Sequence, residues 1–185
     1  MCASAHVMLA EKLDAVRGKH VGVFGLGPAG LVFVQLARAA GATRVSGFDP
    51  VPERRDLARN LGADEAFASA DDFPVRGQTG CLDSAFDCVG SPAAVHQAME
   101  VTQSLVVLFA VQREPYMFPP KCWPNFILAG TQPHTREAAE YAAARLEDGR
   151  LTLAPIVTHT MPLEDYARAV NLLRSREAVK VAFLL

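Results

Sequence analysis

Apolar residues occur in two patterns along the chain: short solid runs, and stretches with helical spacing. The run Lys19–Gly25 is apolar and ends in glycine, which is typical of a buried parallel strand. Pro28 opens a helical stretch, Ala29–Ala40, and Gly41 follows it. Proline at the start and glycine just past the end are the asymmetry expected of a helix. The pattern therefore predicts a strand that leads directly into a helix.

The same strand-then-helix order recurs at intervals of about 20–30 residues. Apolar runs predict further strands at Arg44–Phe48, Asp64–Phe67, Ala85–Val89, Leu105–Val111, Phe126–Ala129 and Val179–Phe183. Helical spacing predicts further helices over Met1–Leu13, Pro52–Leu61, Pro92–Val101, His134–Leu146 and an apolar stripe from Leu163 to Leu173. This alternation predicts an α/β fold with a doubly wound parallel sheet of about six strands (a Rossmann fold), followed by a short C-terminal helix–strand extension.

The length of 185 residues suits a single domain. We expect one domain over residues 1–185, with a sheet core over about 1–150 and a C-terminal segment over about 151–185. The segment Pro115–Pro124 (PYMFPPKCWP) contains four prolines and is expected to be an irregular excursion.

Composition and charge exclude several classes of partner. The 18 Lys and Arg residues nearly balance 20 Asp and Glu residues, for a net charge of −2, so no bulk positive field attracts nucleic acid or anionic lipid. The longest clean apolar run, Leu105–Val111, is far shorter than the about 20 residues that span a bilayer. The cysteines stand at positions 2, 81, 88 and 122 without a C-x-x-C pair, which favours reduced thiols and a cytoplasmic protein.

A glycine-rich motif follows the first predicted strand. Gly25, Gly27 and Gly30, with Pro28 and Ala29 between the last two, match G-x-G-x-x-G at the point where the strand gives way to a helix. In this context the glycines permit a tight turn, close approach of a pyrophosphate and close helix–strand packing, and the helix N-terminus attracts the phosphates. The alternative is a purely structural turn.

Asp49 strengthens the dinucleotide interpretation. It ends the second predicted strand, about 20 residues past the motif, where a carboxylate accepts hydrogen bonds from an adenosine ribose and repels a 2′-phosphate. NAD is therefore favoured over NADP, although a helix-capping Asp would also explain this position.

Arg54 either covers the adenosine or is a solvated helix residue. The loop Val89–Pro92 either lines the cofactor groove or is a plain strand-to-helix turn.

Together these residues resemble the coenzyme-binding half of zinc-type medium-chain dehydrogenases, the alcohol and polyol dehydrogenase group. The resemblance covers about residues 3–185 and rests on five segments: GKHVGVFGLGPAGLVFVQLARAAGA, VSGFD, ERRDLARNLGADEAF, FDCVGSPAAVHQAM and IVTHTMPLEDYARAVNLL. It implies that the three motif glycines hold the pyrophosphate, and that Asp49 binds and Arg54 flanks the adenosine ribose. It also implies that the loop beside the dinucleotide consists of Cys88, Val89, Gly90 and Ser91.

The sequence departs from the family pattern in two places, and the resemblance also predicts an oligomeric state. The family's N-terminal catalytic domain, with its zinc ligands and proton relay, has no counterpart in this sequence. Thr102–Ser104 replaces a Gly-Gly turn of the family, and Ala110 stands where its following strand ends in glycine. The family dimerises through an edge strand, which implies a homodimer here through Phe126–Ala129. The adjoining Tyr116, Met117, Phe118 and Trp123 would support that interface, unless they fold back onto the core.

Other chemistry is not predicted. The five histidines and four cysteines show no metal-ligand spacing, so no metal is expected. Cys88 lies in a predicted buried strand and Cys81 in a loop, with no histidine nearby in sequence, which argues against a nucleophilic cysteine. Catalytic residues stay unassigned, with folding of Cys122, His134 and His159 into one site left open.

Three functions remain. The leading hypothesis is an NAD(H)-binding oxidoreductase, or part of a longer one, that transfers hydride to or from an unidentified small molecule only when a catalytic domain or separate catalytic subunit is supplied. The alternatives are a stand-alone non-catalytic NAD-binding module and a non-redox biosynthetic enzyme that reuses the cofactor groove.

Overall fold

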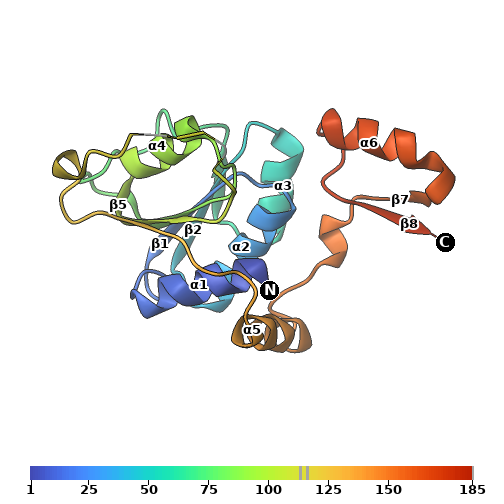
Figure 1. The fold of residues 1–185 in the computed structure, drawn as a ribbon, viewed down its shortest axis with the longest axis horizontal. Helices are drawn as coiled ribbons and strands as arrows, with labels where there is room; N and C mark the ends of the chain where they lie inside the picture. Colours follow the sequence, from blue (N-terminus) through green and yellow to red (C-terminus); the bar gives the residue numbers. More distant parts are fainter. Residues whose placement is uncertain (113, 116, 185) are drawn as a thin grey trace. The chain divides into compact units, whose positions relative to one another are not determined.

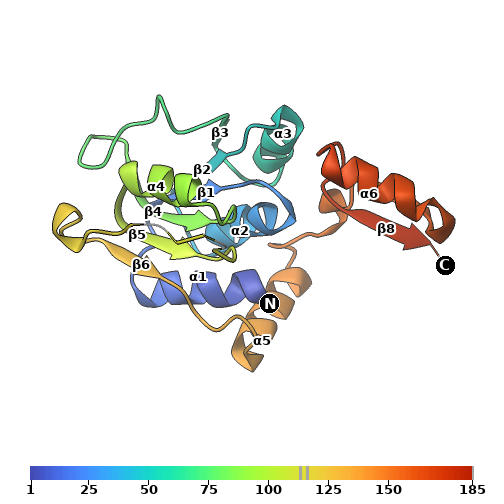
Figure 2. The ribbon, with the colours of Figure 1, turned by 45° about the horizontal axis from the view of Figure 1, so that its top comes forward.

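A six-stranded parallel sheet organises Met1–Leu151, the larger of two units in this computed structural model. The structure describes residues 1–112, 114–115 and 117–184. The fold is drawn in Figure 1, and Figure 2 shows the strands in the order β3-β2-β1-β4-β5-β6. They are β1 (His20–Phe24), β2 (Arg44–Phe48), β3 (Glu65–Phe67), β4 (Leu82–Asp87), β5 (Thr102–Leu108) and β6 (Ile127–Ala129). The predicted α/β fold of Rossmann type is confirmed.

Helices cover both faces of the sheet. They are α1 (Cys2–Lys12), α2 (Pro28–Ala39), α3 (Pro52–Asn60), α4 (Pro92–Glu100) and α5 (Arg136–Glu147). α1 packs against α2 and α5, and Figure 2 shows α4 on the opposite face of the sheet from α1. The helices predicted in this unit are confirmed, with ends that differ by one or two residues.

Aromatic side chains pack on each face because neighbouring residues of a strand point to opposite sides. On one face the rings of Phe24 and Phe48 stack with centroids 4.4 Å apart, in a buried cluster that includes Val95 of α4. On the other face Phe33 of α2 stacks on Phe86 of β4 with centroids 4.6 Å apart. These contacts fix the sheet between its helices and hold the carboxyl ends of β1, β2 and β4 in place.

Two predicted strands, β4 and β5, have different bounds in the structure. β4 runs from Leu82 to Asp87 rather than from Ala85 to Val89. Thr102–Ser104, which replace the Gly-Gly turn of the family, begin β5, so this strand starts three residues before the predicted Leu105, and Thr102 pairs with Leu82. β5 ends at Leu108 rather than Val111, because the N–H groups of Phe109 and Ala110 both donate to the carbonyl oxygen of Asp87, each at 3.0 Å, and this turns the chain.

The smaller unit, Thr152–Leu185, contains a two-stranded parallel sheet. Its elements are β7 (His159–Pro162), α6 (Tyr166–Arg174) and β8 (Val181–Leu184). The predicted helix and final strand are present, and β7 is an addition to the predicted extension. The sequence HTMP gave no apolar alternation to reveal β7, since Met161 is its one buried residue.

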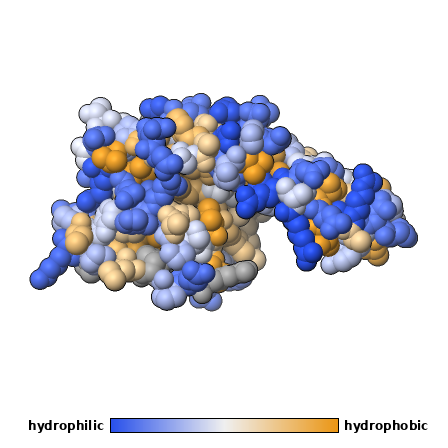
Figure 3. Space-filling model, turned by 90° about the horizontal axis from the view of Figure 1, so that it is seen from above, coloured by the Kyte–Doolittle hydropathy of each residue, from blue (hydrophilic) through white to orange (hydrophobic). Residues whose placement is uncertain are grey.

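Across the described part of the chain, no helix combines the length and apolar character that a membrane crossing requires. On the face shown in Figure 3, hydrophobic residues form small patches among hydrophilic ones.

Candidate functional site

The glycine motif forms a tight turn between β1 and α2. Gly25 follows β1 with φ +85°, and its N–H donates to the carbonyl oxygen of Phe48 at 2.8 Å. A Cβ on Gly30 would lie 1.8 Å from the carbonyl oxygen of Gly25, so a side chain there would collide with the turn. A Cβ on Gly27 would meet nothing within 4 Å. The first and third glycines are therefore needed for packing, and the second leaves open space over the turn.

The start of α2 offers free backbone donors beside this open space. Gly27 is the N-cap and supplies no side-chain cap, and Pro28 occupies the first helical turn. The first-turn N–H groups of Ala29 and Gly30 have no acceptor within the helix. With the positive end of the helix dipole, they make a site suited to a phosphate.

Asp49 lies directly after β2 and is only 5% exposed. One carboxylate oxygen accepts from the N–H of Leu26 at 2.8 Å, and the other accepts from the N–H of Val51 at 2.9 Å. These bonds hold the carboxylate against the glycine turn. An ionised carboxylate has about four lone-pair positions, so it can still accept hydrogen bonds from hydroxyl groups of a ligand.

The two arginines after Asp49 have different partners. Nη1 of Arg54 lies 3.7 Å from Oδ2 of Asp49, and within the described residues the buried Nε of Arg54 has no hydrogen-bond partner. Arg55 donates to the carbonyl oxygens of Asp49 at 2.8 Å and Pro50 at 2.9 Å. Arg54 is therefore beside the carboxylate, while Arg55 ties down the turn before α3.

The loop after β4 abuts both neighbouring loops. The N–H of Cys88 donates to the carbonyl oxygen of Phe24 at 2.8 Å, and a Cβ on Gly25 would lie 2.8 Å from Cγ2 of Val89. Gly90 has φ +80°, and a Cβ there would lie 2.7 Å from the carbonyl oxygen of Val111. Ser91 is the N-cap of α4 and accepts from the N–H of Ala94. All the predicted cofactor residues thus gather at the carboxyl edge of the sheet.

Cys88 is packed within this edge. Burial raises the pKa of its thiol well above the ordinary value, and the neighbouring Asp87 carboxylate adds to the effect. A thiol that resists ionisation is a poor nucleophile.

Asp87, the last residue of β4, is a site residue that the sequence analysis missed. Its buried carboxylate accepts from the N–H groups of Val89 at 3.1 Å and Gly90 at 3.2 Å, and from Nε2 of Gln112 at 2.8 Å. Burial raises the pKa of this carboxyl. Asp87 therefore fastens together the loops after β4 and β5. An acid ending an apolar strand, as Asp49 ends β2, was the available signal.

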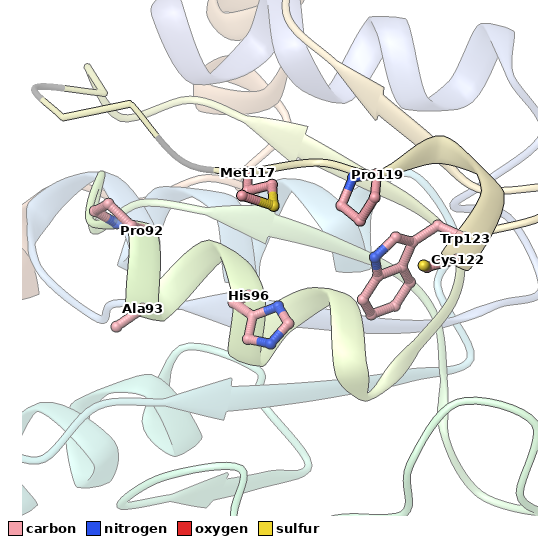
Figure 4. Close-up of a pocket in the computed structure, with 7 residues that line it drawn as sticks. All are labelled: Pro92, Ala93, His96, Met117, Pro119, Cys122 and Trp123. Atoms are coloured by element: carbon pink, nitrogen blue, oxygen red, sulfur yellow. The ribbon is translucent and has the colours of Figure 1, made fainter.

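A pocket of about 660 Å³ lies between α4 and the proline-rich excursion (Figure 4). Its described lining is Pro92, Ala93, His96, Met117, Pro119, Cys122 and Trp123. The rings of His96 and Trp123 face each other edge to face, with centroids 6.1 Å apart. The pocket adjoins the loop that contains Ser91, since the next residue, Pro92, is part of the pocket lining. Its mostly apolar wall suits an uncharged group rather than a phosphate.

Comparison with known proteins identifies the family. A model of the zinc-binding dehydrogenase family matches residues 28–120, half of the chain. The match begins after the first two motif glycines and includes Gly30, Asp49 and the loop after β4. The chain belongs to the zinc-binding dehydrogenase family.

Other members of this family match over part of their length. S-(hydroxymethyl)glutathione dehydrogenase of Synechocystis is 29% identical over 180 residues, which cover 88% of this chain and 48% of that relative. The structure of alcohol dehydrogenase TADH from Thermus sp. ATN1 is 27% identical, with a TM-score of 0.82, and the match covers 100% of this chain and 56% of that one. The chain thus spans about half the length of these relatives.

A third similarity shows the fold alone. A zinc-binding dehydrogenase of Sinorhizobium meliloti, whose structure contains NADP, is 22% identical, with a TM-score of 0.77. The match covers 91% of this chain and 53% of that one.

The name of the zinc-binding dehydrogenase family implies a zinc ion. Among residues 1–112, 114–115 and 117–184, no three His, Cys, Asp or Glu side chains gather as metal ligands. Structural and catalytic zinc sites use three or four such protein ligands. The described residues therefore do not fit a zinc site. The three residues left open as one site are separate in their contacts: His134 contacts Cys2, Cys122 lines the pocket with His96, and His159 contacts Thr158.

Proposed function

We propose that this chain binds NAD(H) at the carboxyl edge of its six-stranded sheet and is the coenzyme-binding part of an oxidoreductase. The observation that carries the proposal is the Asp49 carboxylate, which two backbone N–H groups hold at the end of β2 beside the glycine turn. Ligands of open α/β sheets bind in this crevice, and a carboxylate at this place recognises a ribose diol.

The residues around Asp49 would make the remaining contacts with the cofactor. Gly25, Gly27 and Gly30, with the N–H groups after Pro28, would hold the pyrophosphate. Arg54 would flank the adenosine ribose, since it lies 3.7 Å from Asp49. The loop of Cys88, Val89, Gly90 and Ser91 would flank the dinucleotide. The bound cofactor supplies hydride transfer at its nicotinamide ring, and the protein supplies orientation.

Charge around Asp49 supports NAD(H) as the preferred cofactor. A 2′-phosphate on the ribose would bring a second negative charge close to this nearly buried carboxylate. Arg55, the obvious counter-charge, is engaged with two backbone carbonyls. Arg54 lies on the carboxylate itself and offsets part of the repulsion without removing it.

Hydride transfer needs further groups to stabilise developing charge and to move a proton. We assign these groups to residues outside this chain's cofactor site, in a catalytic domain or a separate subunit. The four free cysteines fit reduced thiols, and a cytoplasmic location is part of the proposal.

Titration calorimetry with NADH and NADPH tests the proposal on the native chain, Asp49→Asn and a control, Asp14→Asn. Asp14 is a suitable control because its side chain is 90% exposed. The native chain and the control should bind NADH at least about tenfold more tightly than NADPH, and Asp49→Asn should lose most of that preference. Failure of the folded native chain to bind either cofactor would overturn the proposal. Tighter binding of NADPH would overturn the cofactor preference alone.

A further inference from the structure

A thiol and an imidazole from opposite ends of the larger unit's sequence meet on its surface. Sγ of Cys2 lies 3.3 Å from Nε2 of His134, within hydrogen-bond reach. Cys2 is the first residue of α1, and His134 immediately precedes Thr135, the N-cap of α5. Both ribbon views place the N-terminus beside α5 (Figures 1 and 2), and the two helices pack against each other. The pair is therefore held by two packed elements.

The surroundings of the pair favour a reactive sulfur. The N-cap of α1, Met1, provides no side-chain cap, so first-turn N–H groups and the positive end of the helix dipole lie beside Cys2. Helix N-termini and neighbouring histidines are the environments that activate cysteine thiols. Cys2 is partly exposed, so a reagent in solution can reach it. Within the described residues no third metal-ligating side chain joins the pair, which distinguishes it from a metal site.

A small cavity of about 280 Å³ is lined by residues of α1 and by residues around the start of α5, the two elements that hold the pair. Its lining includes Ala5, one turn along α1 from Cys2, and Thr135, the neighbour of His134. It extends along α1 to Lys12, and from Ala5 to Lys12 a helix rises roughly 10 Å. An extended tripeptide has about the same length. Lys12 and Glu137 place opposite charges on the wall, which suits a zwitterionic peptide.

We propose that Cys2 is a nucleophilic thiol, activated by His134, that forms a mixed disulfide with small zwitterionic peptide disulfides. Nε2 of His134 takes the thiol proton, and the sulfur of Cys2 attacks one sulfur of the peptide disulfide. The disulfide bond of the reagent breaks as the new one forms. The leaving thiolate takes the proton from the imidazolium and departs as a thiol, so the peptide disulfide is the only oxidant required.

The test is reaction of the native chain with glutathione disulfide, followed by mass spectrometry of each cysteine peptide. Cys122 is exposed and serves as the internal reference. Cys2 should react about tenfold faster than Cys122, and His134→Gln should slow Cys2 about tenfold while leaving Cys122 unchanged. His159→Gln, which alters an exposed contact in the smaller unit, should have no effect on Cys2.

Two further measurements separate activation from folding and from cavity binding. Added imidazole should restore the Cys2 rate in His134→Gly, which a merely misfolded variant would not show. Lys12→Gln should slow reaction with glutathione disulfide about threefold but not with the uncharged 2-hydroxyethyl disulfide. A Cys2 rate equal to that of Cys122, or unaffected by His134→Gln, would overturn the proposal. Equal effects of Lys12→Gln on both reagents would overturn the assignment of the cavity.

Discussion

Because Gly30 has no side chain, α2 can lie close to the glycine turn. A Cβ at this position would lie 1.8 Å from the backbone oxygen of Gly25, which cannot move without disturbing β1. Gly30→Ala should therefore lower the free energy of unfolding by about 2–4 kcal/mol and weaken NADH binding. Urea unfolding and calorimetry measure the two effects.

Gly27→Ala is the matched control for this prediction. Its added Cβ meets nothing within 4 Å, so the free energy of unfolding should change by less than about 1 kcal/mol. The added methyl group would occupy the space left for the pyrophosphate and should weaken NADH binding. Two variants with equal losses of stability would contradict this account of the turn.

His20 gives the stability of the molecule a dependence on pH. Its Nε2 lies 2.7 Å from Oγ of Ser46, which donates to Glu65 at 2.7 Å, so the three residues link β1, β2 and β3. Burial lowers the pKa of His20 below its ordinary value of 6.5, and the charge of Arg44 adds to this effect. The unfolded chain therefore takes up the proton first as the pH falls. The contribution of His20 to stability is present above about pH 6.5 and is lost below it.

Urea unfolding at about pH 7.5 and about pH 5.5 measures this contribution. The native chain should lose stability between the two values, and His20→Gln should lose less over the same interval. His159→Gln, which removes a half-buried imidazole of the smaller unit, should retain the native loss. An identical pH dependence in the native chain and His20→Gln would refute the role given to His20.

At the scale of elements, β6 is one of the two edge strands of the sheet and the predicted dimer contact. Ile127 of this strand is 48% exposed and Met117 of the preceding excursion is 87% exposed. Phe118 and Trp123 instead pack against the core, and Tyr116 lies outside the described residues. The dimer prediction thus depends mainly on the edge strand, whose outer backbone groups can pair with a second copy.

Light scattering at micromolar concentration tests the dimer. The native chain should have the mass of two copies, and Ile127→Lys should shift it toward the mass of one, because a buried unpaired charge opposes strand pairing. Leu153→Lys, at an exposed apolar residue of the smaller unit, should leave the mass unchanged. A native chain with the mass of one copy would reject the prediction.

Sequence periodicity predicted the elements whose burial is one-sided or complete, and it missed features that depend on tertiary contacts. β1, β2 and α2 bury mainly apolar residues, so their pattern is local. The end of β5 depends on the carbonyl of Asp87 in a neighbouring strand, and β7 depends on pairing with β8. The positions of Gly25 and Asp49 followed from motif spacing, and the resemblance implied that of Ser91. The sequence could not predict the contact of Asp87 with Gln112 or that of Cys2 with His134, because nothing in the residues between them indicates that these side chains meet.

For the whole molecule, we expect cofactor binding without substantial dehydrogenase turnover. The chain spans about half the length of its relatives, and its described residues gather no zinc ligands. Without groups that stabilise an alkoxide and exclude water, turnover should fall at least about a thousandfold below a typical dehydrogenase rate of about 10 per second. NADH formation with a panel of alcohols and polyols, with and without added zinc, measures it. Turnover near one per second by the purified chain would contradict the prediction.

The strand order β3-β2-β1-β4-β5-β6 also sets the order in which the protein can fold during its synthesis. β1 pairs early with β2, but its other neighbour, β4, leaves the ribosome only after β3 and the long segment that follows it. Val21 of β1 can pair with Ser84 of β4 only after β4 has been synthesised. Until then the backbone N–H and C=O groups on one side of β1 are unpaired, and this apolar strand of the nascent chain is accessible to chaperones.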